Sequence, residues 1–167
     1  MYRTGIMTLS DKGSKGQRED KSGPMIQTML STTNLYQVVK TIILPDDLET
    51  IKKNLITWVD DDHLDLILTT GGTGFSQRDW TPEATIAVCE RMTPGIPEAM
   101  RYHSLQITPK AMLSRSAAGI RKQTLIINLP GSPKAVKENL EAILPALDHG
   151  LEMLLSSGSA NCAEPLK

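Results

Sequence analysis

Apolar positions along the chain follow two patterns that alternate. Four short apolar runs, bounded by turn-forming residues, predict buried strands. They are residues 3–9, 37–44, 64–68 and 124–129. Between these runs, apolar residues recur at helical spacing, which predicts amphipathic helices. This alternation favours a single domain over residues 1–167, with a three-layer α/β/α fold whose sheet is mostly parallel and has a short antiparallel element.

Prolines are expected to interrupt the later helices, because proline lacks the N–H that continues a helix. In residues 93–116 we expect short helices broken at Pro94, Pro97 and Pro109. Near the end of the chain, Pro145 is expected to separate a helix over residues 134–144 from one over residues 146–155.

Residues 64–85 hold the strongest candidate site in the chain. Here the third apolar run passes into a loop with Gly71, Gly72 and Gly74. Glycine accepts positive φ and has no side chain, so the N–H groups of this loop could close around an anion such as phosphate. A plain turn between a strand and a helix is the alternative. The loop is neither a GxGxxG fingerprint nor a GxxxxGK[ST] P-loop.

A helix is expected directly after this loop, over residues 81–92. Thr81 is the expected N-cap residue, and Pro82 suits the first helical position. The positive end of the helix dipole would then lie beside the loop. Asp79 lies between the glycines and this helix, where it could bind a ligand or simply support the helix start.

Four polar loops follow the predicted strands, and the ends of parallel strands meet at one edge of a sheet. The loops are SDKGSKGQRED, PDD, TTGGTGFSQRD and NLPGSPK. In the first, Ser10, Asp11 and Asp20 are candidates for binding, although a solvated loop without a role is an equal alternative. Carboxylates beside phosphate need a cation between them, which predicts Mg²⁺ shared by Asp46, Asp79 and phosphate oxygens.

Composition narrows the class of partner. The 18 basic and 19 acidic residues nearly balance, which does not favour a nucleic-acid partner or an anionic membrane surface. Apolar segments are too short to span a bilayer, so a cytoplasmic location is expected. Cys89 and Cys162 lack the close spacing of a zinc site or a disulfide framework.

The motifs TTGGTG and RDWTPEAT, with PDD before them and MLSR, GIRKQTLIINLPGSPK and ILPAL after them, resemble those of a known family. The chain is similar to the molybdopterin adenylyltransferases, which include the bacterial MogA type and the G domains of gephyrin and of plant Cnx proteins. The resemblance runs from the SDK loop to about Leu155. Trp80 departs from it, since a smaller aliphatic residue is common there, and Asp47 and Phe75 stand at variable places.

This resemblance implies a homotrimer that uses ATP as co-substrate and Mg²⁺ as cofactor. It would adenylylate the terminal phosphate of molybdopterin, release pyrophosphate and hand the product to the molybdate-inserting enzyme. Asp46 and Asp79 match the two family aspartates associated with catalysis. A phosphate monoester is already anionic, so we expect these aspartates to bind the metal or orient substrate rather than accept a proton.

The expected contacts to ATP and to the pterin phosphate come from the same loops and from the MLSR motif. They are Ser10, Asp11, Thr70, Gly71, Gly72, Thr73, Gly74, Ser114, Arg115, Asn128, Pro130, Gly131, Ser132 and Lys134. Two other functions stay open at this point. One is a non-catalytic molybdopterin-binding or scaffold trimer, and the other is a nucleotide hydrolase.

Overall fold

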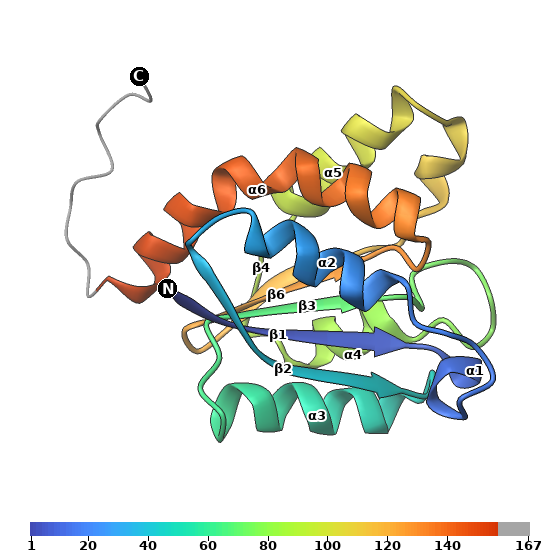
Figure 1. The fold of residues 1–167 in the computed structure, drawn as a ribbon, viewed down its shortest axis with the longest axis horizontal. Helices are drawn as coiled ribbons and strands as arrows, with labels where there is room; N and C mark the ends of the chain where they lie inside the picture. Colours follow the sequence, from blue (N-terminus) through green and yellow to red (C-terminus); the bar gives the residue numbers. More distant parts are fainter. Residues whose placement is uncertain (157–167) are drawn as a thin grey trace.

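The computed structural model describes residues 1–156, which form a six-stranded sheet with helices on both faces (Figure 1). The strands are β1 (Tyr2–Leu9), β2 (Tyr36–Leu44), β3 (Leu66–Thr70), β4 (Arg91–Met92), β5 (Ala118–Arg121) and β6 (Thr124–Leu129). The helices are α1 (Asp11–Ser14), α2 (Ser22–Ser31), α3 (Leu48–Asp60), α4 (Thr81–Val88), α5 (Gly95–Leu105), the 3₁₀ helix η1 (Pro109–Leu113) and α6 (Pro133–Leu155). Residues 157–167 of the expected domain, Cys162 among them, lie outside this description.

The sheet has the order β2-β1-β3-β6-β5-β4. The first four strands in this order are parallel, whereas β5 and β4 are antiparallel additions at one edge. After β1 the chain continues to β2 on one side of the sheet, and after β3 it continues to the other side, where β6, β5 and β4 lie. Between the neighbouring strands β1 and β3, the loops at the carboxyl ends therefore diverge and leave a crevice, which is where ligands bind in sheets of this kind.

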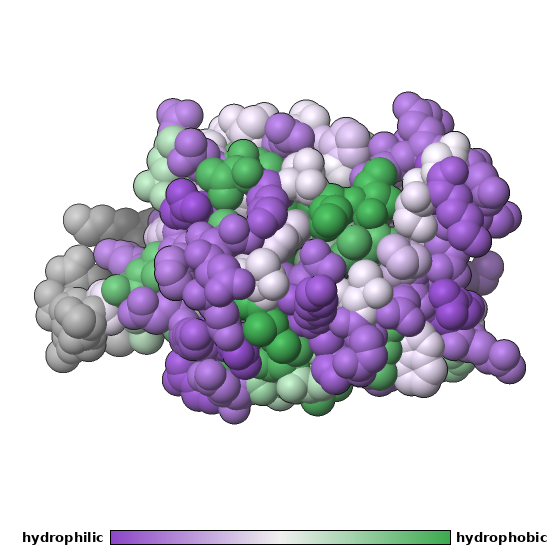
Figure 2. Space-filling view, turned by 90° about the horizontal axis from the view of Figure 1, so that it is seen from below, coloured by the Kyte–Doolittle hydropathy of each residue, from purple (hydrophilic) through white to green (hydrophobic). Residues whose placement is uncertain are grey.

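Two apolar layers enclose the sheet, as alternate residues of each strand face opposite sides. In β3, Leu66 and Leu68 belong to the layer under α2, α5 and α6, while Ile67 belongs to the layer under α3 and α4. The expected three-layer α/β/α fold, with its mostly parallel sheet, is therefore confirmed. The side that carries α3 is mainly polar, and its apolar surface is divided into separate patches (Figure 2). Within residues 1–156, no helix combines the length and apolar character that crossing a membrane requires.

The helix after the glycine loop is shorter than predicted. It ends at Val88 rather than continuing to residue 92, because the backbone becomes extended at Cys89. The following residues then pair with β5: the N–H of Glu90 donates to the carbonyl of Ile120 at 2.8 Å. A sheet edge satisfies these backbone groups as well as a helix does, and helical spacing in the sequence does not distinguish the two.

Two of the expected proline breaks are wrong. Pro97 lies inside the first turn of α5, where the N–H that it lacks would have no acceptor within the helix. Pro145 lies within one continuous α6. A proline inside a helix costs about 3 kcal/mol. Here the apolar stripe continues on both sides of it, with Ile143 and Leu147 both buried in the core, and this burial offsets the cost.

Candidate active site

The four predicted loops do meet at the carboxyl ends of β1, β2, β3 and β6, where they line a cleft of about 760 Å³. Nine of the predicted residues line it: Ser10, Asp20, Asp46, Thr70, Gly71, Gly72, Asp79, Gly131 and Ser132. The cleft therefore contains Asp46, Asp79 and the glycine loop. The convergence that was predicted from the parallel sheet is confirmed.

The backbone of the glycine loop favours glycine at two positions. Gly71 and Gly72 have φ of 100° and 64°. A Cβ on Gly71 would lie 2.3 Å from the carbonyl oxygen of Leu9, and one on Gly72 would lie 2.3 Å from the hydroxyl of Thr81. Within residues 1–156, the N–H groups of Gly72, Thr73 and Gly74 donate no hydrogen bond to the chain. Binding of an anion by these N–H groups stays a prediction.

Thr81 fastens this loop rather than capping the helix. The N-cap residue of α4 is Trp80, which makes no side-chain cap, so the predicted cap at Thr81 is wrong. The Thr81 hydroxyl instead donates to the carbonyl oxygen of Gly71 at 2.9 Å, and its N–H donates to that of Gly72 at 3.2 Å. The side chain is fully buried, so the loop and the helix start are held as one unit.

Asp46 is positioned by a reciprocal pair of hydrogen bonds with Asp11. The N–H of Asp11 donates to the Asp46 carboxylate at 2.9 Å, and the N–H of Asp46 donates to the Asp11 carboxylate at 3.0 Å. Arg78 holds Asp11 in turn through two hydrogen bonds of 2.9 Å. Arg78 comes from the loop that also carries Asp79. This chain of contacts therefore links the three loops that follow β1, β2 and β3.

Asp46 is a partly buried carboxylate that lies near two other carboxylates, those of Asp11 and Asp79. Burial raises the pKa of Asp46 above its usual value, and the charges of Asp11 and Asp79 act in the same direction. The hydrogen bond from the Asp11 N–H and the charge of Arg78 act against this rise. For Asp11 itself, the hydrogen bonds from Arg78 lower the pKa. A cation bound near Asp46 would therefore stabilise its ionised carboxylate, which burial and the neighbouring carboxylates disfavour.

The donor set fits a Mg²⁺ ion that shares its ligands with a substrate. Asp46 and Asp79 both line the cleft, and the Ser76 N–H orients the Asp79 carboxylate at 2.9 Å. No group of three or more acidic, histidine or cysteine side chains within residues 1–156 is placed to hold a metal alone. Protein sites for Mg²⁺ commonly use one or two carboxylates, with phosphate oxygens and water for the rest.

Basic residues of the cleft were missed by the sequence reasoning. Arg18 and Lys21 line it, and both lie in the polar loop after β1. Arg78, which holds Asp11, directly precedes Asp79 in the sequence. The signal for them in the sequence is that basic residues are interleaved with the carboxylates of these loops. Asp20, a predicted candidate, caps α2 by accepting from the N–H groups of Ser22 and Gly23 at 3.0 Å.

A second cavity, of about 300 Å³, is lined in part by the glycine loop and by the loop that follows β6. Of the predicted contacts, Thr73, Gly74, Ser114 and Pro130 line it. Its other wall comes from α5, η1 and α6 and includes Arg101 and Lys110, which were not predicted. Two cavities thus lie next to each other, one along Gly71 and Gly72, the other along Thr73 and Gly74.

Four predicted contacts line neither the cleft nor the second cavity. Arg115 lies beside Asp79 in a third cavity, and Asp11 is engaged by Arg78 as described. Asn128 is fully buried and donates to the hydroxyls of Thr69 and Thr85 at 3.0 and 2.7 Å. The Lys134 side chain is 80% exposed and lies 3.8 Å from Glu138. Neither Asn128 nor Lys134 lines the three cavities described here.

Similarity to known proteins covers most of the chain. The model of a family described as "Probable molybdopterin binding domain" matches residues 5–149. The chain belongs to this family. It is 47% identical over 154 residues to the molybdopterin adenylyltransferase of Helicobacter pylori strain J99, a match that covers 92% of this chain and 88% of that one.

Two further comparisons agree with this membership. The chain is 44% identical over 171 residues to gephyrin of Dictyostelium discoideum, which covers 96% of this chain and 23% of gephyrin. The crystal structure of the molybdopterin biosynthesis enzyme MoaB from Thermus thermophilus has a TM-score of 0.88 and 49% identity, covering 92% of this chain and 96% of that one. The resemblance expected from the motifs is confirmed.

Proposed function

We propose that the chain transfers AMP from ATP to the terminal phosphate of molybdopterin in the biosynthesis of the molybdenum cofactor. One observation supports this most strongly: the two aspartates that match the family's catalytic pair, Asp46 and Asp79, line one cleft with a glycine loop that has free N–H groups. The name of the Helicobacter pylori relative, molybdopterin adenylyltransferase, agrees with this activity.

In the proposed reaction, one bond forms and one bond breaks. An oxygen of the molybdopterin phosphate attacks the α-phosphorus of ATP, and the bond from that phosphorus to the bridging oxygen of the β-phosphate breaks, which releases pyrophosphate. Because the attacking oxygen is already anionic, the protein has to align two polyanions rather than remove a proton. When bound, Mg²⁺ would offset the repulsion between these phosphates.

The roles of the chain's own residues follow from their positions. Asp46 and Asp79 would hold the cation, and Asp11 and Arg78 keep Asp46 oriented. The N–H groups of Gly72 and its neighbours would bind phosphate oxygens. The adjacent cavities along residues 71–74 provide space for two ligands that meet at the loop.

A non-catalytic molybdopterin-binding protein is the second candidate, because the description of the matched family states binding and not transfer. Pyrophosphate release separates the two. We expect release only when ATP, Mg²⁺ and molybdopterin are all present. Release without molybdopterin would indicate a nucleotide hydrolase, and tight binding of molybdopterin without release would indicate the non-catalytic protein.

Asp79→Asn is the variant that tests the proposed site, and Asp61→Asn is its control. Both remove one negative charge, but Asp61 follows the far end of α3, away from the cleft. We expect Asp79→Asn to lose most pyrophosphate release and Asp61→Asn to retain it. Equal activity of the two variants would contradict the assignment. The homotrimer, the cytoplasmic location and the hand-over to a molybdate-inserting enzyme stay predictions; a monomer mass in light scattering would contradict the first.

A further inference from the structure

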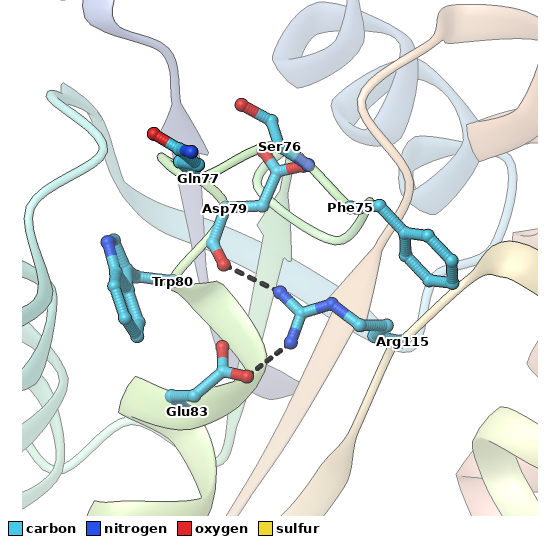
Figure 3. A pocket seen from close by; sticks show the side chains of 7 residues that line it. All are labelled: Phe75, Ser76, Gln77, Asp79, Trp80, Glu83 and Arg115. Carbon is cyan, nitrogen blue, oxygen red and sulfur yellow. Dashed lines mark hydrogen bonds and ion pairs between the residues drawn. The ribbon is translucent and has the colours of Figure 1, made fainter.

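A third cavity, of about 500 Å³, adjoins the cleft at Asp79 and has two aromatic walls (Figure 3). Phe75 and Trp80 belong to the segment between the glycine loop and α4, and they are 70% and 40% exposed. Two large aromatic side chains on one short exposed segment are costly to leave in water, and such pairs commonly mark binding sites. The proposed transfer reaction does not use them.

The Arg115 guanidinium lines the same cavity and is fixed by three hydrogen-bond partners. Its Nε donates to the carbonyl oxygen of Gly74 at 2.6 Å, one terminal nitrogen donates to that of Asp79 at 2.6 Å, and the other pairs with Glu83. These bonds use three of the five N–H donors of the guanidinium and fix its plane, and the predicted phosphate contact of Arg115 stays a prediction. What it offers is a fixed planar face, and its side chain is 32% exposed.

Figure 3 shows Phe75 and Trp80 on opposite sides of Arg115. Aromatic rings and guanidinium planes are the groups on which proteins stack flat heterocycles, since every such ring has a π-face. A cavity of this size falls within the usual range for small-molecule sites. Trp80 contributes the larger of the two rings that line this cavity.

We propose that Phe75, Trp80 and the Arg115 plane form a stacking site for the fused heterocyclic ring of a substrate. The inference rests on the proposed function, because both of its substrates carry such a ring: the purine of ATP and the pterin of molybdopterin. Asp79 lines both this cavity and the cleft. A ring bound here would therefore leave its phosphates beside Asp79 and the glycine loop.

Calorimetric titration with three probes tests the site without requiring turnover. The probes are ATP with Mg²⁺, inorganic tripolyphosphate with Mg²⁺, and 6-hydroxymethylpterin, which carries no phosphate. We expect Phe75→Ala and Trp80→Ala each to weaken binding of one ring-bearing probe about tenfold, the size typical of losing one stacked aromatic partner. Tripolyphosphate should bind as it does to the wild type. The probe that responds identifies the ring as purine or pterin.

A conservative variant and a distant one complete the test. Trp80→Phe keeps a ring and should restore binding close to the wild-type value. Tyr102→Ala removes an aromatic side chain that is 73% exposed and lines none of the three cavities, so it should change nothing. Fluorescence gives a second readout: a stacked ring should quench Trp80, whereas Trp58, which is 1% exposed, should not respond.

Three results would overturn the stacking site: ring binding that both alanine variants leave unchanged, an equal loss of tripolyphosphate binding, or a change in oligomeric mass with ring binding intact. The last would make the aromatic pair a contact between copies of the chain. These outcomes are separate from the proposed function. Ring binding that depends on Trp80 without any adenylyl transfer would refute the activity alone, and full transfer with unchanged ring binding would refute only the stacking site.

Discussion

Replacing Gly72 with alanine should damage both folding and activity, and Gly16 provides a matched control. Both glycines have positive φ, 64° at Gly72 and 69° at Gly16. A Cβ at Gly16 would meet nothing within 4 Å, whereas one at Gly72 would lie 2.3 Å from the Thr81 hydroxyl and 3.2 Å from the Asp46 carboxylate. The two variants therefore share the backbone strain and differ in the crowding.

The expected magnitudes follow from these contacts. An L-residue in the left-handed region costs about 1–2 kcal/mol, which is all that Gly16→Ala should lose. Gly72→Ala must also displace the buried Thr81 hydroxyl from the Gly71 carbonyl, and an unsatisfied buried group costs about 1–3 kcal/mol more. The total for Gly72→Ala is roughly 2–5 kcal/mol. The effect of alanine on the unfolded chain is the same in both variants and cancels in their difference.

Urea unfolding followed by tryptophan fluorescence measures the free energies of unfolding, and pyrophosphate release measures activity. A double-mutant cycle locates the cause. In a Thr81→Ala background, the hydroxyl is gone, so Gly72→Ala should cost less than in the wild type and approach the roughly 1–2 kcal/mol of Gly16→Ala, while the tighter contacts with the Asp46 carboxylate at 3.2 Å and the Cβ of residue 81 at 3.3 Å remain. If Gly72→Ala were no more destabilising than Gly16→Ala and kept its activity, the close packing of the loop against Thr81 and Asp46 would be refuted.

Variants at three further positions test the charges of the structure. Burial raises the pKa of Asp46, so its ionised form disfavours folding as pH rises above the ordinary aspartate pKa of 3.8. Asp46→Asn should be inactive yet more stable than the wild type in urea at neutral pH, and this difference in stability should vanish below pH 3.8. A less stable variant at neutral pH would contradict this reasoning. The pKa of Asp60 shifts in the opposite direction: hydrogen bonds, first from Arg121, lower it to about 2. Asp60→Asn should therefore be less stable than the wild type at neutral pH, and this difference should be lost as pH falls toward about 2. A difference in stability that does not depend on pH would refute this. Arg78→Ala should lower kcat roughly tenfold with little change in urea unfolding, because the exposed Arg78 guanidinium acts through Asp11 on Asp46. Arg78→Lys should recover part of the lost kcat. Equal kcat in the wild type and both variants would show that Arg78 has no role in the site.

The sequence was sufficient for features that depend on local pattern and on the rules of parallel sheets. Apolar runs located the strands β1, β2 and β6 to within a residue or two, and the rule for strand ends brought Asp46 and Asp79 into one cleft. The glycine pattern indicated positive φ, which Gly71 and Gly72 have. These features follow from backbone sterics and from burial, which the order of residues expresses directly.

What the sequence could not provide was the direction of side chains across loops. Arg78 and Asp11 are far apart in the chain, and nothing local shows that they form an ion pair. The Thr81 hydroxyl could have capped its own helix, but the Gly71 carbonyl is the acceptor it uses. Pro145 fails as a helix break for a similar reason, because the core that compensates for it is assembled from distant segments. In each case tertiary contacts overrule a sound local preference.

The most direct test of the proposed function is the identity of the product. Wild-type protein incubated with ATP, Mg²⁺ and molybdopterin should yield adenylyl-molybdopterin, detected by mass spectrometry, together with one pyrophosphate for each product molecule. Asp46→Asn and Asp79→Asn should yield almost none, and Asp61→Asn should yield as much as the wild type. Absence of adenylylated pterin with the wild-type protein, or equal product from all four proteins, would contradict the assignment of this cleft as an adenylyl-transfer site.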